Sequence, residues 1–364
     1  MDKIKIVYII STLVKSGPVN VLYNLIKYID KNRYNVTIIT LSPENEKHSR
    51  LKEFESLGIK VQSLNLSRLQ GYLFGGFKLR QIINKVKPDI IHSHCFRSNL
   101  FSAFFLNRYR RCTTVHSDYK TDLTKLYPGV LGWILYFLNH ISLLLIKKNI
   151  CCSEVLAKIL TDRYKYINFS YVNNGIDTEI FKPVENKQAL RENLGLPQDK
   201  NIIIWVGSFI ERKNPFEMIN MILSDKNDDN YYIFCGDGPL LEDSKKYLQN
   251  YNNVMFTGRI DNILKYLQAS DFYISTSKSE GLPMSVIEAL ACGNGVILSD
   301  IPQHRIFDEK DFIKFYTNKD SLKDLIKNSK NCQDNQTFEY IQEKFSANLM
   351  FTEYIRKYSL IVEE

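Results

Sequence analysis

A regular alternation of short apolar runs with longer amphipathic runs is the feature that most restricts the fold of this chain. In the first half, helix-like runs such as Val19–Ile29, Phe77–Lys87 and Glu154–Tyr164 separate strand-like runs. The strand-like runs are residues 4–10, 35–41, 59–65, 89–94, 111–116, 149–152 and 169–172. Repeated strand–helix–strand units predict a parallel sheet with helices on both faces and ligands beyond the carboxyl ends of the strands.

The same rhythm restarts near residue 200. The strand-like runs of this second half are residues 202–206, 231–235, 254–259, 269–277 and 295–300. With 364 residues the chain is longer than one core usually serves. We therefore predict an α/β protein of two domains, residues 1–178 and 184–345. Apolar residues at helical spacing over 347–361 predict a last helix that docks back on the first domain.

Charge is spread unevenly along the chain. Residues 1–180 hold 26 Lys and Arg against 13 Asp and Glu, and the remainder holds 22 against 27. A first domain this basic is suited to an anionic membrane surface or an anionic acceptor. Nucleic acid is not expected as a partner, because no basic run is interleaved with aromatic residues.

The cysteines bear on the compartment. There are seven, without metal-ligand spacing, at positions 95, 112, 151, 152, 235, 292 and 332. This pattern is typical of buried free thiols in a reducing environment, so we expect a cytoplasmic protein.

The segment Val130–Ile146 is nearly all apolar and leaves three alternatives open. Its length is at the lower edge of a membrane span, and Asn139 and His140 interrupt its middle. A helix packed on the sheet is the main expectation, because the segment stands between two predicted strands. A helix that also touches the bilayer, peripherally at the inner membrane face, is the second alternative, and a true span is the third.

The stretch from Ser279 to Gly293 carries the chemistry around which the second domain is arranged. It follows a strand-like run, and Pro283 suits the first position of a helix that ends at Gly293. The free backbone N–H groups at such a helix start can hold an anion. Glu280 lies at the mouth of this loop and Glu288 two turns into the helix, on the side away from the core. Two carboxylates that accept hydroxyl protons therefore flank a phosphate site, as a sugar nucleotide requires.

Two cations precede a second predicted helix start. Arg212 and Lys213 come directly before Asn214, a suitable N-cap, and Pro215, a suitable first helical residue. Cations at this end of a helix are unfavourable unless an anion is also present. This placement favours phosphate binding, although solvated side chains would be placed in the same way.

Two histidines end predicted strands of the first domain, His94 and His116. A lone histidine at a strand end is more often structural than catalytic. His116 has the stronger functional claim because its position faces the rim where ligands bind.

These motifs together resemble the retaining GT-B glycosyltransferases of family four, also called glycosyl transferases group 1. Glu280 and Glu288 match the E-x7-E signature, and Lys213 matches the lysine that closes the V-G-x-x-x-x-x-K motif. Three further matches follow in the family's order: His116, Asn174–Asp177 and Gly236–Pro239. The resemblance implies two Rossmann-like parallel-sheet domains facing across a cleft, with the donor on the second domain and the acceptor side on the first.

By this resemblance, Lys213 neutralises the leaving diphosphate, Glu280 contacts the donor hexose and His116 positions the sugar or acceptor. Glu288 is implied to hold the ribose hydroxyls, and Arg259 is placed near the nucleobase by its position. The other implied donor-binding residues are Gly17, Arg212, Gly281, Leu282, Met284 and Ser285.

The chain departs from the family pattern twice. Ser16-Gly17 stands where the family often has two glycines, and Ser208 stands where it often has an arginine, which Arg212 would have to replace. No D-x-D triplet occurs, so no metal site and no cofactor are expected, and the nucleotide sugar is a substrate.

The sequence thus predicts a retaining, metal-independent transferase that moves a hexosyl unit from a nucleoside diphosphate sugar, with UDP the expected nucleotide. A glycan or lipid-linked saccharide in the assembly of capsule or exopolysaccharide is the expected acceptor. A sugar-nucleotide 2-epimerase and a non-catalytic sugar-nucleotide or glycan-binding module are the alternatives. A nicotinamide-dependent oxidoreductase is disfavoured because its phosphate loop is absent.

Overall fold

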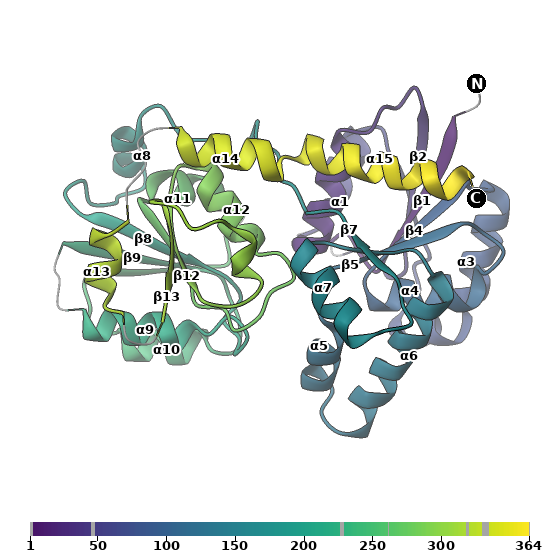
Figure 1. Ribbon diagram of the computed structural model, residues 1–364, viewed down its shortest axis with the longest axis horizontal. Helices are drawn as coiled ribbons and strands as arrows, with labels where there is room; N and C mark the ends of the chain where they lie inside the picture. The colour runs from purple at the N-terminus through teal and green to yellow at the C-terminus, as the bar shows by residue number, and fades with distance from the viewer. Residues whose placement is uncertain are drawn as a thin grey trace. The chain divides into compact units, whose positions relative to one another are not determined.

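The computed structural model describes residues 3–44, 48–225, 229–260, 262–317, 320–329 and 335–363. The chain divides into two compact units, Met1–Gly175 with Ala347–Glu364 and Ile176–Ser346 (Figure 1). Each unit is an α/β sandwich around one parallel sheet, so the prediction of two parallel-sheet domains is confirmed. The predicted first domain ended at residue 178, and the structure divides three residues earlier.

The first unit holds a seven-stranded sheet in the order β3-β2-β1-β4-β5-β6-β7. Its strands are β1 (Ile4–Ile10), β2 (Tyr34–Thr40), β3 (Lys60–Ser63), β4 (Ile90–His94), β5 (Arg111–Val115), β6 (Asn149–Cys151) and β7 (Phe169–Tyr171). Its helices are α1 (Gly17–Lys27), α2 (Leu51–Ser56), α3 (Arg68–Val86), α4 (Phe96–Phe105), α5 (Tyr119–Leu126), α6 (Val130–Ile146), α7 (Glu154–Arg163) and α15 (Ala347–Glu363). All seven strands predicted from the alternation are present, within two residues at either end.

The second unit holds a six-stranded parallel sheet in the order β10-β9-β8-β11-β12-β13. Its strands are β8 (Asn201–Val206), β9 (Asn230–Cys235), β10 (Val254–Gly258), β11 (Phe272–Ser275), β12 (Gly295–Ser299) and β13 (Ile313–Tyr316). Its helices are α8 (Lys187–Asn193), α9 (Pro215–Ser224), α10 (Leu241–Tyr247), α11 (Ile263–Ala269), α12 (Met284–Ala291), α13 (Leu322–Lys327) and α14 (Gln336–Phe345). Strand β13, which pairs with β12, was not among the predicted strands.

Helix α3 begins at Arg68, whereas the sequence pattern placed its start at Phe77. The Ser67 hydroxyl accepts a hydrogen bond from the backbone N–H of Gln70, and the Gln70 side chain accepts one from the backbone N–H of Ser67. This capping box fixes the earlier start. Glycines in the first half of α3 leave room for aromatic side chains of α4. A Cβ at Gly76 would lie 2.4 Å from the ring of Phe105.

Helix α15 closes the first unit (Figure 1). It packs along α1 and is buried through Met350, Tyr354, Tyr358 and Ile361. Its tyrosines form hydrogen bonds inside the unit: the Tyr358 hydroxyl lies 2.9 Å from that of Tyr8. The chain's last helix is therefore part of the first unit's core.

Helix α6 covers the predicted apolar segment and packs mainly on α4 and α5. In the part of the chain that the structure describes, no helix combines the length and apolarity needed to cross a membrane. Of the cysteines, five are buried and Cys95 is half-buried, all as free thiols, while Cys332 lies outside the described residues.

Candidate active site

The site residues predicted on the second unit gather at the point where its strand order reverses. Strands β8 and β11 are neighbours although β9 and β10 lie between them in the sequence. Ligands of open parallel sheets bind beyond the carboxyl ends of the strands at such a switch point. The loop after β8 carries Arg212 and Lys213, and the loop after β11 carries Glu280.

Hydrogen bonds lock these two loops together. The backbone N–H of Lys278 donates to the carbonyl of Arg212 at 2.8 Å. The Thr276 hydroxyl lies 2.9 Å from the carbonyls of Lys213 and Asn214. Asn214 occupies the predicted N-cap position of α9, but its backbone is left-handed, with φ of 51°, and its side chain makes no cap. Asn214 is thus the N-cap residue, as predicted, but the Thr276 hydroxyl rather than an Asn214 side-chain hydrogen bond holds this turn.

Glu280 binds both cations of the β8 loop. The Lys213 Nζ lies 2.6 Å from Glu280 Oε1, and the Arg212 Nη1 lies 3.0 Å from Oε2. Burial alone would raise the pKa of Glu280, but the two cations hold it at about 2. Cations at a helix start need a nearby anion, and for Arg212 and Lys213 the carboxylate of Glu280 provides one.

The start of α12 stands next to this cluster. Its N-cap position is Pro283, and within the described residues no side chain caps the helix. Val286, Ile287 and Leu290 are buried, as predicted for the core side. The amino end of α12 therefore offers backbone N–H groups and a positive partial charge beside Lys213.

Glu288 lies on the other face of α12 and is half-buried. Burial raises its pKa to about 7, against the opposing effect of Lys213. A carboxylate with this pKa changes its charge near neutral pH, so its capacity to accept hydrogen bonds from hydroxyls depends on pH.

The predicted donor-binding residues around α12 differ in exposure. Gly281 and Leu282 are buried, and Met284 and Ser285 are half-buried. The Ser285 hydroxyl shares a 2.7 Å hydrogen bond with Tyr273. Arg259 is exposed after the edge strand β10, with β9 between it and β8. The structure thus groups the α12 residues with Lys213 and leaves Arg259 at the sheet's rim.

The Gly236–Pro239 motif supports the β8 loop. A Cβ at Gly236 would lie 1.8 Å from the carbonyl oxygen of Gly207, and one at Gly238 would lie 2.7 Å from that of Phe209. Only glycine permits this approach, and both residues have positive φ. The motif therefore fixes the backbone that leads to Arg212 and Lys213.

A layer of small polar side chains behind Glu280 was not predicted. The Ser277 hydroxyl donates to Glu280 Oε1 at 2.6 Å, and the Ser299 hydroxyl donates to the Ser277 carbonyl at 2.7 Å. Buried His304 lies 3.2 Å from the hydroxyls of Ser275 and Ser299. The sequence signal was a serine at the end of each of two strands, β11 and β12, with a histidine five residues after the second. This signal becomes meaningful once β11 and β12 are known to pair.

In the first unit, His94 and His116 come together at the carboxyl ends of β4 and β5. His94 Nδ1 lies 3.0 Å from His116 Nε2, so one of the two imidazoles donates to the other. Burial lowers the pKa of His116 to about 3 and holds that of His94 well below its usual value. Both rings are therefore neutral at neutral pH, and the hydrogen bond couples the tautomer of His116 to that of His94.

A buried network continues from these histidines to α15. The ring of His92 packs on that of His94, with centroids 4.4 Å apart. His92 Nδ1 lies 2.7 Å from the Tyr358 hydroxyl, and the Thr114 hydroxyl lies 2.7 Å from that of Tyr354. Gly17, the first residue of α1, has nothing within 4 Å of a built Cβ, so the packing of the unit does not itself require glycine there.

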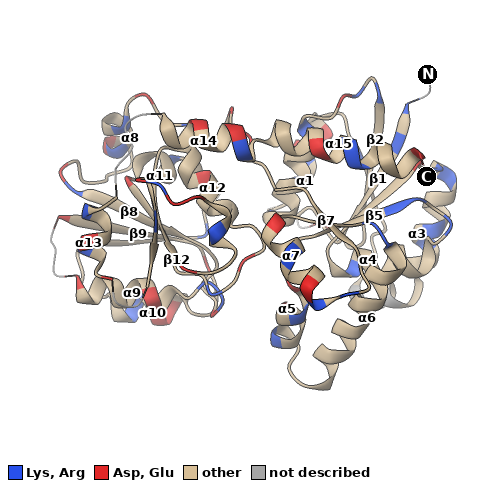
Figure 2. Ribbon diagram, viewed as in Figure 1, with Lys and Arg blue, Asp and Glu red and all other residues tan. Residues whose placement is uncertain are grey.

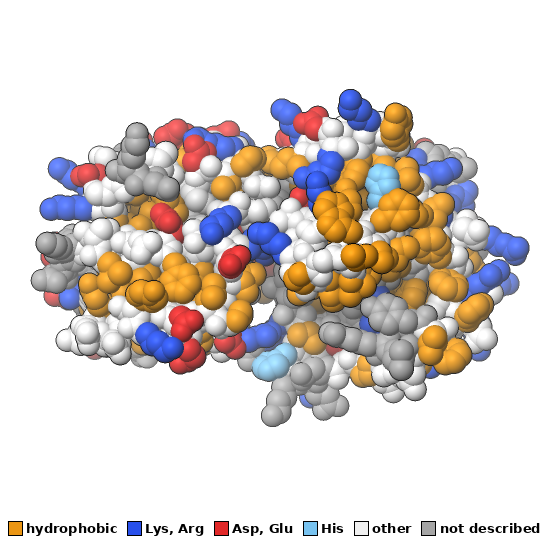
Figure 3. All heavy atoms as spheres, turned by 90° about the horizontal axis from the view of Figure 1, so that it is seen from below, with side chains coloured by type: hydrophobic (Ala, Val, Ile, Leu, Met, Phe, Trp, Pro, Cys, Tyr) orange, Lys and Arg blue, Asp and Glu red, His pale blue; other side chains and the backbone are white. Residues whose placement is uncertain are grey.

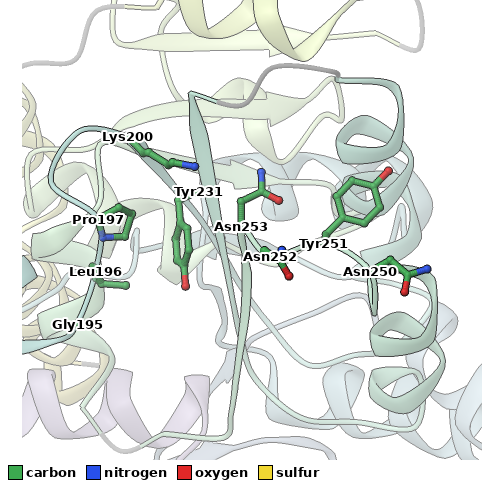
Figure 4. A pocket seen from close by; sticks show the side chains of 9 residues that line it. All are labelled: Gly195, Leu196, Pro197, Lys200, Tyr231, Asn250, Tyr251, Asn252 and Asn253. Atoms are coloured by element: carbon green, nitrogen blue, oxygen red, sulfur yellow. The ribbon is translucent and has the colours of Figure 1, made fainter.

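One hollow lies away from all of these residues. It measures about 800 Å³ and is lined by Tyr231, Tyr251, Lys200 and three asparagines, Asn250, Asn252 and Asn253 (Figure 4). These residues lie at the amino ends of β8, β9 and β10, the opposite edge of the sheet from Lys213.

In the described ranges no group of three or more His, Cys, Asp or Glu could hold a metal ion.

Two family models match the chain, one on each half. The model described as Glycosyltransferase Family 4 matches residues 15–180, and the one described as Glycosyl transferases group 1 matches residues 186–343. The second match contains Lys213, Glu280 and Glu288, and the first contains His116.

Known relatives agree with these matches. The UDP-Gal:alpha-D-GlcNAc-diphosphoundecaprenol alpha-1,3-galactosyltransferase of Escherichia coli is 26% identical over 65% of this chain and 64% of its own, just under two thirds of its length. The O-antigen biosynthesis glycosyltransferase WclY of Escherichia coli is 26% identical over 99% of each chain. Anabaena HepE, solved in complex with UDP and glucose, shares the fold with a TM-score of 0.81 at 15% identity, over 98% of this chain and 99% of its own.

Proposed function

We propose that this chain is a group 1 glycosyltransferase, since family models of that group match residues 15–180 and 186–343. We further propose that it transfers a hexosyl unit, with retention of configuration, from a nucleoside diphosphate sugar. UDP is the proposed nucleotide, since HepE binds UDP and the galactosyltransferase is named for UDP-galactose. A glycan or lipid-linked saccharide is the proposed acceptor, because one relative acts on a sugar diphosphoundecaprenol and another in O-antigen synthesis. The reaction would serve cell-surface polysaccharide assembly from the cytoplasmic side.

The single observation that carries this proposal is the charged cluster at the switch point. Lys213 and Arg212 meet Glu280 beside the uncapped start of α12. When the bond between C1 and the diphosphate oxygen breaks, negative charge builds on the β-phosphate. Cations and aligned N–H groups aimed at that charge lower the barrier, and one such donor is worth roughly 3–4 kcal/mol.

The roles of the remaining residues follow from this geometry. With Lys213 on the diphosphate, Glu280 becomes available to accept hydrogen bonds from the donor hexose, and Glu288 to accept them from the ribose. Arg212 would take the place of the arginine that the family often has at the position of Ser208, since Arg212 contacts the same carboxylate, Glu280, as Lys213 does. We assign Gly17 and Arg259 to donor binding on their motif positions alone.

The proposed reaction proceeds by attack on the same face that the diphosphate leaves. The acceptor oxygen forms the new bond to C1 as the diphosphate departs with the bonding electron pair, and the departing phosphate oxygen takes the acceptor's proton. His116, kept neutral by burial and hydrogen-bonded to His94, positions the sugar or acceptor. We propose that no metal and no cofactor take part, since Lys213, Arg212 and the start of α12 supply the positive charge.

A screen of nucleotide sugars by thermal unfolding tests the donor class. A ligand that binds only the folded state raises the melting temperature, so UDP and one UDP-hexose should do so and NAD should not. Turnover of that donor in EDTA tests whether the reaction needs a metal ion. Product analysis with and without acceptor separates the alternative functions. Epimerised donor without acceptor would indicate a 2-epimerase, and binding without hydrolysis or transfer would indicate a binding module.

A further inference from the structure

Helix α6 exposes many of its apolar side chains to solvent, while it buries two polar residues together with Leu143 and Ile146. Asn139 and Ser142 are buried, and Asn139 Oδ1 has no hydrogen-bond partner among the described residues. Ile134 and Phe137, one turn apart, are 51% and 61% exposed. A surface helix in water usually turns its apolar stripe to the core, so this amount of exposed apolar surface is unusual.

The exposed surface extends beyond one helix. Val130, Leu131 and Trp133 are also exposed on α6, and Leu73, Phe74 and Phe77 are 60% to 62% exposed on α3. Helix α4 packs against both helices, and its Phe104 is 47% exposed. Figure 3, which views the side from which α5 and α6 project, shows hydrophobic side chains gathered in a broad patch on the first unit. We call these exposed residues of α3, α4 and α6 the apolar face.

The segments that carry the apolar face are basic, and the neighbouring α5 holds Lys120 and Lys125 together with Asp122. Segments 57–88, 90–117 and 123–153, which contain α3, α4 and α6, hold thirteen lysines and arginines and no aspartate or glutamate. Figure 2 shows α6 itself without charged residues. Lys120 of α5 lies 5.8 Å from the ring centre of Trp133, and Lys147 and Lys148 directly follow α6.

We propose that the apolar face is a docking surface for an anionic lipid bilayer. Apolar side chains with tryptophan enter the boundary between headgroups and acyl chains, and each flanking lysine or arginine near an anionic surface adds attraction. A second copy of the chain is disfavoured as the occupant, because pairing two such faces would bring like charges together. The inference stands independently of the transferase chemistry.

The two tryptophans make the surface testable in the unmodified protein. Trp133 is 55% exposed on the apolar face, and Trp205 is 2% exposed in the core of the second unit. Vesicles of phosphatidylglycerol and phosphatidylcholine with brominated acyl chains should quench Trp133 and leave Trp205 unquenched. Trp133→Phe should remove the quenching, and high salt should weaken it.

A pair of double variants provides the matched comparison. Ile134→Ser with Phe137→Ser should lower vesicle partitioning about 30-fold or more, because two apolar side chains that would enter the bilayer are lost. Leu223→Ser with Tyr247→Ser, which alters residues 39% and 60% exposed on the second unit, should leave partitioning unchanged. Nucleotide-dependent stabilisation should be equal in both, which reports the fold and the donor site separately.

Three outcomes would overturn the proposal. The first is no partitioning of the unmodified protein onto anionic vesicles at low salt. The second is equal partitioning of the two double variants. The third is lipid-free self-association, seen by sedimentation velocity and abolished by the changes at Ile134 and Phe137, which would make a second copy the occupant.

Discussion

The carboxyl edges of the two sheets have the same topology but opposite electrostatic character. In the second unit, Lys213, Arg212 and Glu280 are charged and paired. In the first unit, His94 and His116 are neutral, because burial lowers the pKa of each. The same backbone scaffold thus provides one edge suited to an anionic leaving group and one suited to uncharged hydroxyls.

The difference arises from what stands behind each edge. Glu280 is held by a serine and two cations and remains ionised. The histidines of the first unit contact one another and, through His92, the tyrosines of α15. A donor with a diphosphate fits the charged edge, and an acceptor hydroxyl fits the neutral one.

Removing Lys213 should produce the largest effect. Lys213→Ala removes the cation that meets the leaving diphosphate, and turnover should fall about 10²–10³-fold with the fold intact. Single-turnover kinetics at saturating donor measure this, with Lys213→Arg as a control that keeps the charge. A full-rate Lys213→Ala enzyme would mean that the charged edge does not act on the leaving group.

A change on the neutral edge should cost less. His116→Ala removes one uncharged hydrogen bond to the sugar or acceptor, so kcat should fall about 10-fold while nucleotide affinity is retained. His94→Ala, which frees the tautomer of His116, should show part of the same loss. If the loss at His116 instead matches that at Lys213, the two edges do not differ in the way described.

Glu288 should make nucleotide binding depend on pH. Its pKa is raised to about 7, so the carboxylate that accepts hydrogen bonds from the ribose is lost as the pH falls from 8 to 6. Calorimetry should show UDP affinity declining several-fold across this range. Glu288→Gln should bind UDP about 10-fold more weakly and without this pH dependence. Unchanged affinity in this variant would contradict the ribose assignment.

The smallest expected effect is a difference in acid sensitivity. The folded-state pKa of His92 and His116 is about 3 against 6.5 when unfolded, so the first unit loses stability as the pH falls below about 6.5. Glu280 is depressed from 4.5 to about 2, so its stabilisation is present above pH 4.5 and is lost only below that value. Burial also lowers the pKa of His304, behind residues 272–299, to about 4. Hydrogen exchange at pH 5.5 should therefore increase more in residues 90–116, where the pKa of three histidines is lowered, than in residues 272–299, which contact one such histidine. Equal changes in both segments would remove this distinction.

The sequence by itself determined the architecture. The alternation of runs located twelve of the thirteen strands found in the described residues, because a strand buried on both faces must be apolar along its length. The family motifs also placed Lys213 and Glu280 in loops that follow particular strands, and Glu288 within the next helix. Helix α3 was only half predicted, because its glycines serve contacts with α4 that no local pattern records.

Only the tertiary structure decided how side chains distant in sequence meet. Lys213 and Glu280 are 67 residues apart, and their contact depends on β8 lying next to β11. The contact of the α15 tyrosines with the histidines of β4 likewise depends on how distant elements pack. So does the exposure of apolar residues on α6. Periodicity gives the order of elements along the chain and the side on which apolar residues fall. Which surface each side meets is set by packing, since it depends on every other element at once.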